Sequence, residues 1–238
     1  MLRRPPIESL VVDDLVFTVR WSRRRRTIGI TVARDGGLVV AAPAGVPARK
    51  LEGFVRAKLP WVRRKRAEFE ALGPPPRPAT FGEGEILPYL GRRYRIALAD
   101  DPPAPVALRG GRFQIARDLD GRARPEVAAW YTSRARERVA HSIARFAPQV
   151  GAAPATVVVR DLGKRRWGVC DHRASKVGFH WQLVTQPPDL VDYVVVHELA
   201  HLLEPHHGAA FWELVASVLP DWKLRRRRLR ESGRDLLL

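Results

Sequence analysis

The stretch VVVHELAHLLEPHHGAAFW, residues 194–212, contains four of the seven histidines of the chain. Its central segment, His197-Glu198-Leu199-Ala200-His201, is an HExxH motif between apolar residues, which predicts a helix. Histidines at positions i and i+4 lie one turn apart on one helix face, with Cβ atoms about 5–6 Å apart. His197 and His201 are therefore candidate ligands of one Zn²⁺ ion. Glu198 projects beside this pair, where it can accept a proton from a metal-bound water, and it is the candidate catalytic residue.

A catalytic zinc ion usually has three protein ligands, so a third is expected after the motif. The candidates are His206, His207, Glu204 and Glu213. The spacing from His201 to His207 is the one that metzincins use, although Glu204 stands where metzincins have glycine. Helical periodicity does not separate His206 from His207, and the choice stays open at this point.

The C-terminal half predicts helices around two short strands. Asp189 is the candidate N-cap of the HExxH helix, with Asp192 at its third position, and Pro205 ends the helix after Glu204. The other predicted elements are strands at 156–160 and 176–184, a helix along the stripe Val127, Tyr131, Ala135, Val139, Ile143 and Phe146, and helices at 208–219 and 220–232, the last ending at Gly233. The apolar stripe of helix 208–219 is expected to pack the turn that carries His207 against the HExxH helix.

The N-terminal half is richer in strands. Strands at 15–20, 27–33 and 38–42 are expected to form an antiparallel meander, with a turn at Asp35-Gly36-Gly37, followed by a helix over 47–72 and a stiff break at 73–78. A hairpin around Gly91 is expected over 86–98, and another strand over 112–116. No internal repeat is visible.

This order of strands and helices is an α+β pattern and not a βαβ repeat. We expect a β-rich N-terminal region with one long helix over residues 1–124 and a second region with the HExxH helix over residues 125–238.

The composition restricts where the protein works. The single cysteine, Cys170, cannot form an internal disulfide, and neither a signal peptide nor a membrane-spanning segment is recognisable, so a cytoplasmic protein without a membrane partner is expected. The 42 basic residues against 25 acidic ones, 36 of them arginine, favour a polyanionic partner such as nucleic acid or nucleotides. A solvated basic surface is the alternative.

The C-terminal part resembles the YgjP-like family of predicted zinc metallopeptidases, which are related to the SprT-like zincins. The matching residues are Arg166-Trp167-Gly168, Cys170, Trp181, Leu183, Pro187-Pro188, Tyr193 to His201, His207, Phe211-Trp212 and Pro220-Asp221-Trp222. The arginine-rich segment at 20–33, APAGVP at 42–47 and LPYLGRRYR at 87–95 are also similar, so the resemblance covers about 16–230. The chain departs from the pattern where Val169, Asp171 and Gly208 replace serines and where His180 and His206 replace asparagines, so serine-mediated substrate contacts are not expected and His206 could compete as a ligand.

The resemblance implies a zincin-like C-terminal region in which His197, His201 and His207 bind one Zn²⁺ ion and Glu198 is the catalytic base. It also implies that the strand before the HExxH helix, here 176–184, borders the cleft and offers its edge to a peptide. Trp167, Trp181 and His180 are then candidate rim residues, with strand core as the alternative for the tryptophans. His180 is a candidate for stabilising an oxyanion, and Cys170 is expected to be a core thiol.

The expected activity is that of a zinc-dependent hydrolase, with a metallopeptidase acting on peptide or protein substrates as the first hypothesis. A metal-dependent nucleoside triphosphate (pyrophospho)hydrolase at the same site is the alternative, favoured by the arginines but lacking a glycine-rich phosphate loop. A DNA-binding protein with a structural zinc is the third hypothesis, which an intact Glu198 and an open fourth coordination position disfavour.

Overall fold

The computed structural model describes residues 8–33, 36–71, 79–119, 121–163 and 166–232. The chain folds as two compact units, Met1–Pro76 and Arg77–Leu238. Each unit has its own cluster of buried apolar side chains, and both α-helices and β-sheets are present, as the α+β prediction requires. The predicted boundary at residue 124 lies inside the second unit, because the strands before it pack into the same core as the helix after it. The predictions for Asp35, for 72–78 and for Gly233 lie outside the described residues.

The first unit is a four-stranded sheet with one helix. Its elements are β1 (Ser9–Val12), β2 (Leu15–Ser22), β3 (Gly29–Val32), β4 (Leu38–Pro43) and α1 (Ala48–Ala71). The strand order is β1-β2-β4-β3, and β2 and β4 are parallel. The predicted antiparallel meander is therefore wrong, since β3 pairs with the far side of β4 and not with β2. The predicted helix is present, and its buried stripe comprises Leu51, Val55, Leu59 and Val62.

The second unit begins with a sheet of the same topology. Its strands are β5 (Ile86–Tyr89), β6 (Arg92–Ala99), β7 (Val106–Arg109) and β8 (Arg112–Ala116), in the order β5-β6-β8-β7. The hairpin predicted around Gly91 is confirmed, with positive φ at Leu90 and Gly91. Because β6 and β8 are parallel and a long helix follows, both units contain the same ββββα arrangement. The sequence showed no repeat, so the duplication is one of topology.

The long helix α2 (Ala123–Val150) connects the parts of the second unit. It contacts β7, β9 and the HExxH helix α3 (Pro188–Ala200). Tyr131 lies against Phe113 of β8, and the Asp192 carboxylate on α3 binds the side chains of Arg138 and Ser142 at 2.6 and 2.7 Å. A buried carboxylate with two donors fastens one helix to the other.

The sheet next to the HExxH helix has three strands, β9 (Thr156–Arg160), β10 (Gly168–Asp171) and β11 (Lys176–His180), in the order β10-β11-β9. The strand predicted over 176–184 ends at His180, where the imidazole Nδ1 accepts a hydrogen bond from Gln182 N and a 3₁₀-helix (Trp181–Thr185) begins. This strand lies in the middle of the sheet, so the expectation that its edge is free for a peptide is wrong. The edge beside the HExxH helix belongs to β10, which contacts α3.

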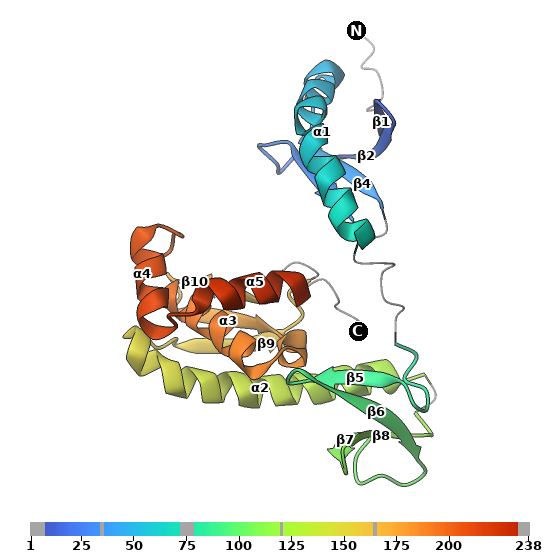
Figure 1. Ribbon diagram of the computed structural model, residues 1–238, viewed down its shortest axis with the longest axis vertical. Coiled ribbons are helices and arrows are strands. Elements are labelled where there is room, and N and C mark those ends of the chain that lie inside the picture. The colour runs from blue at the N-terminus through green and yellow to red at the C-terminus, as the bar shows by residue number, and fades with distance from the viewer. Residues whose placement is uncertain (1–7, 34–35, 72–78, 120, 164–165, 233–238) are drawn as a thin grey trace. The chain divides into compact units, whose positions relative to one another are not determined.

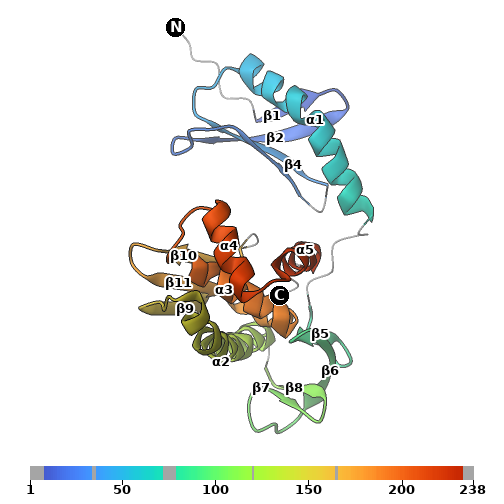
Figure 2. The same cartoon turned by 60° about the vertical axis from the view of Figure 1, so that its left-hand side comes forward.

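Helix α3 lies between α2 and the two last helices, α4 (Ala209–Val218) and α5 (Trp222–Ser232) (Figures 1 and 2). It begins at Pro188, so Asp189 is not its N-cap; the Asp189 carboxylate instead pairs with Arg228 of α5. It ends at Ala200, four residues before the predicted end, and continues as single hydrogen-bonded turns to Glu204. Among the described residues, none of the helices has the length and apolar character to cross a membrane.

Candidate metal centre

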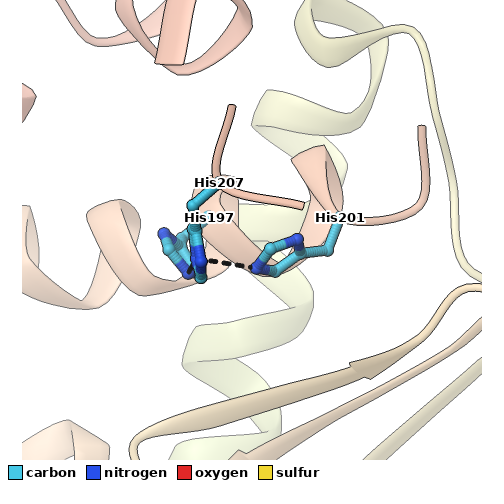
Figure 3. A group of neighbouring side chains, drawn as sticks. All are labelled: His197, His201 and His207. Atoms are coloured by element: carbon cyan, nitrogen blue, oxygen red, sulfur yellow. Dashed lines mark hydrogen bonds between the residues drawn. The ribbon is translucent and has the colours of Figure 1, made fainter. Parts of the chain in front are cut away.

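Three imidazoles from two consecutive segments meet at one point. His197 is on α3, His201 caps its C-terminus, and His207 lies in the turn before α4. His207 Nε2 is 3.1 Å from His201 Nε2 and 3.1 Å from His197 Nε2 (Figure 3). The early end of α3 lets the chain turn back within six residues, so that His207 reaches the two helical histidines.

The surroundings orient His201 and keep His197 and His201 neutral. His201 Nδ1 is 3.0 Å from Glu204 O, which directs Nε2 toward the other two rings. Burial, and then the nearness of His201 and His207, lowers the pKa of His197 to about 3. Burial also lowers the pKa of His201. A neutral imidazole has a lone pair on the nitrogen that is not protonated, which is the form that binds metals.

Aromatic rings from the last two helices support the third histidine. Trp212 of α4 stacks on His207 with ring centroids 5.5 Å apart and 19° between the planes. Trp222 of α5 stacks on Trp212, with ring centroids 4.2 Å apart and 12° between the planes. The Arg226 guanidinium lies 4.8 Å from the Trp212 ring centroid. The buried Phe211 ring lies within 5.0 Å of all three imidazole centroids. The expectation that helix 208–219 packs the His207 turn against the HExxH helix is confirmed.

Glu198 lies beside the histidines and against the edge strand. Its side chain is only 6% exposed, and this burial raises the pKa of its carboxyl to about 8. A Cβ atom placed on Gly168 of β10 would lie 2.5 Å from Glu198 Oε1 and 2.6 Å from Glu198 Cγ. Any side chain at residue 168 would therefore displace the carboxylate.

The histidines and Glu198 line a hollow of about 410 Å³. The other residues that line it are Arg166, Gly168, Val169, Cys170, His172 and Pro205. Sequence reasoning gave no role to Arg166, Gly168 or His172. A glycine within a β-strand is a signal of close backbone approach, and it was available at Gly168.

The alternative ligands lie apart from the three histidines. Among the described residues, only His197, His201 and His207 form a group of nitrogen, sulfur or carboxylate donors within 4.8 Å of one another. His206 is exposed and lies outside this group, and the Glu204 and Glu213 carboxylates also lie outside it.

The candidate rim residues also lie outside the hollow. His180 is buried with Nε2 3.2 Å from Asp161 Oδ1 and Nδ1 on Gln182 N, so both ring nitrogens are occupied and the expected oxyanion role is not supported. Trp167 and Trp181 pack partly buried against the main core. Cys170 lines the hollow, but burial raises the pKa of its thiol to about 11, so it is a thiol rather than a thiolate.

The geometry of the three histidines fits a zinc ion. A tetrahedral zinc with Zn–N bonds of about 2.0–2.1 Å holds its ligand nitrogens about 3.3–3.4 Å apart, close to the two separations of 3.1 Å. A single proton can be shared between only two nitrogens, whereas a metal ion can accept a lone pair from all three. His197 Nδ1 is buried and lacks a hydrogen-bond partner within the described part of the chain, so the ring orientation of His197 depends on packing alone.

Comparison with known proteins identifies a family. A family model for the YgjP-like metallopeptidase domain matches residues 26–232. Among solved structures, the metallopeptidase zymogen abylysin of Pyrococcus abyssi is similar over 42% of this chain and 97% of its own, with 20% sequence identity and a TM-score of 0.35. That similarity is too low to support an argument. No curated protein sequence matches the chain.

Proposed function

Because the chain belongs to the YgjP-like metallopeptidase family, we propose that it is a zinc-dependent peptidase whose three converging histidines hold one Zn²⁺ ion. Glu198 is its general base. One observation supports the proposal most strongly: the Nε2 atoms of His197, His201 and His207 converge, and the buried Glu198 follows His197 directly on the same helix. A bound zinc ion lowers the pKa of water toward about 7 and polarises a carbonyl oxygen.

Residues of the chain itself transfer the proton and shape the site. Glu198 must be ionised to act as a base, and a cation held by the three histidines would favour the ionised form. Glu198 Oε1 then accepts the proton of the attacking water and passes it to the nitrogen of the leaving amine. The carboxylate can occupy this position because Gly168 has no side chain to displace it. The buried Phe211 ring packs against all three imidazoles and provides them with an apolar neighbour.

The edge of β10 supports binding of an extended peptide. Strand β10 pairs with β11 on one side, and within the described residues no strand pairs with its other side. Main-chain hydrogen bonds to such an edge hold a peptide as an additional strand. Residues 168–170 also line the hollow that contains the histidines, so a peptide added there passes the metal ligands.

The first test compares zinc-loaded wild type with Glu198→Gln. Both proteins receive an unfolded protein substrate, with and without duplex DNA, and separately a panel of nucleoside triphosphates. The expected result is peptide cleavage by wild type, loss of cleavage by at least about 10³-fold in the variant, and equal zinc content in both. Stimulation by DNA would give the net charge of +17 a role in presenting substrates.

The same experiment decides against the proposal if Glu198-dependent release of phosphate or pyrophosphate occurs without proteolysis. The site would then belong to a nucleotide hydrolase, with exposed arginines such as Arg166 as phosphate ligands.

A further inference from the structure

A second hollow lies on the opposite face of the three-stranded sheet. We call it the outer hollow; it has a volume of about 380 Å³. Its floor is the cross-strand row Val158, Gly178 and Val169, which points away from the face that buries Val177 and Phe179. Arg160, Asp161, Leu162, Arg166, Cys170, Asp171 and Lys176 complete its lining.

The outer hollow adjoins the metal centre across one strand. Arg166, Val169 and Cys170 line both hollows, so only the edge strand β10 and the residues before it separate them. A peptide paired with β10 would send alternate side chains to opposite faces of the sheet. If one side chain enters the hollow with the histidines, its neighbours in the peptide enter the outer hollow.

The cations of the outer hollow are available to a ligand. Arg166 and Lys176 are exposed, and no ion pair joins either of them to a carboxylate in the part of the chain that the structure describes. Within the described residues, the Arg160 guanidinium donates only to the Asp161 main-chain carbonyl, at 3.4 Å.

The two carboxylates of the outer hollow are occupied by local hydrogen bonds. Asp161 Oδ1 accepts from Gly163 N at 2.6 Å and lies 3.2 Å from His180 Nε2. Asp171 Oδ1 accepts from Ala174 N at 3.2 Å. Their capacity to accept bonds from a ligand is therefore reduced, whereas the donors of the three cations are not used up.

We propose that the outer hollow receives an acidic side chain of the peptide substrate and that Arg166 binds its carboxylate. This inference rests on the proposed peptidase function, because it assigns a specificity to that activity. Arg166 is the best placed of the three cations, since it lines both hollows and can reach a residue next to the scissile bond. Its planar guanidinium suits bidentate binding of a carboxylate.

The test uses quenched fluorescent peptides built around one cleavage site mapped in an unfolded protein. Glutamate replaces glutamine at one position at a time, from three residues before the scissile bond to three residues after it. We expect at least one position at which wild type has a kcat/KM about tenfold higher for glutamate than for glutamine, falling with added salt. Arg166→Met should reduce this ratio to below about twofold, and the readout is the ratio rather than the rate on either peptide alone.

Arg173→Met is the matched control, because Arg173 is an exposed arginine in the same β10–β11 hairpin and lines neither hollow. It should keep the wild-type ratio. Binding of the same peptides to zinc-loaded Glu198→Gln, measured by fluorescence anisotropy, should show the same preference without cleavage.

Three results would overturn the inference while leaving the peptidase in place: no position that prefers glutamate, a preference for lysine, or a glutamate preference that survives Arg166→Met. Absence of any Glu198-dependent peptide cleavage would remove the proposed function and this inference with it. The two failures are therefore distinguishable in one set of assays.

Discussion

Among single residues, Gly168 lies so close to the Glu198 side chain that position 168 has no room for a side chain of its own. A methyl group on residue 168 would lie 2.5–2.7 Å from three atoms of the Glu198 side chain. We predict that Gly168→Ala lowers kcat by about 10²-fold, because a displaced base costs that much, and changes zinc affinity by less than about twofold. Steady-state kinetics and a chelator competition measure the two quantities.

Gly208→Ala is the control for that substitution. Gly208 follows the ligand His207, has an ordinary negative φ, and would place its methyl group in open space. It should keep kcat within about twofold of wild type. Equal losses in both variants, or a loss of zinc in Gly168→Ala, would contradict the assigned role of Gly168.

The single cysteine offers a second prediction at this scale. Burial raises the pKa of the Cys170 thiol to about 11, so at pH 7.5 very little of it is thiolate. We predict that iodoacetamide alkylates Cys170 in the metal-free folded protein at least about tenfold more slowly than in the unfolded protein, with a rate that still rises above pH 9. Rapid alkylation that levels off below pH 9 would show a lowered pKa.

Some of the site residues could be predicted because their relation is local. The positions of His197, Glu198 and His201 follow from the period of one helix, which the HExxH spacing defines. His207 needed the family resemblance, because a turn and not a helix delivers it. Gly168 carried a signal of close backbone approach, but its partner Glu198 could not be predicted, because the two meet only through the packing of β10 on α3. The position of Arg166 in the lining of the hollow also depends on the tertiary fold.

At the scale of elements, α4 and α5 hold the third histidine in place through stacked rings. Trp212 stands between His207 and Trp222. We predict that Trp212→Ala weakens zinc binding by about tenfold, since the groups that orient a ligand contribute about that much. Chelator competition checks the change, and far-UV circular dichroism checks that α4 is retained.

Trp61→Ala is the control for the loss of a tryptophan. Trp61 is 38% exposed on α1 of the first unit and has no ring partner within the described residues. Its substitution should leave zinc affinity unchanged. An equal affinity in Trp212→Ala and wild type would mean that His207 is oriented without the stacked rings.

Helices and strands were predicted correctly where their own residue pattern determines them. They were predicted incorrectly where contacts with another segment determine their bounds or pairing. Strands β8 and β9 and helix α4 lie where their patterns indicate. The strand expected over 176–184 stops at His180, because the imidazole of that residue bonds to Gln182 N and begins a tight turn. The meander failed because alternation within a strand does not say which strand pairs with it.

At the scale of the whole molecule, the two buried clusters divide the chain. Phe17 belongs to the cluster of the first unit, and the three proposed zinc ligands belong to the second unit. We predict that Phe17→Ala destabilises the first unit by about 3–5 kcal/mol and leaves zinc affinity within about twofold. Hydrogen exchange followed by mass spectrometry should become faster in β1–β4 and stay slow in α3.

A parallel loss of protection in α3, or of zinc affinity, would show that the two units fold as one. Both units contain the ββββα arrangement, but only in the second is it followed by the helix that carries His197. Comparing hydrogen exchange in the two units therefore tests whether the site depends on the first unit. This repeat is absent from the residue pattern, because topology depends on strand pairing and not on side-chain identity.

We propose that one zinc ion on His197, His201 and His207 works with Glu198 to cleave peptides. The most direct measurement titrates zinc into the metal-free protein and follows cleavage of an unfolded protein. We predict that cleavage rises in proportion to added zinc and saturates at one ion per chain, and that Glu198→Gln binds the same single ion without cleaving. Cleavage that persists without metal, or that survives Glu198→Gln, would contradict the account.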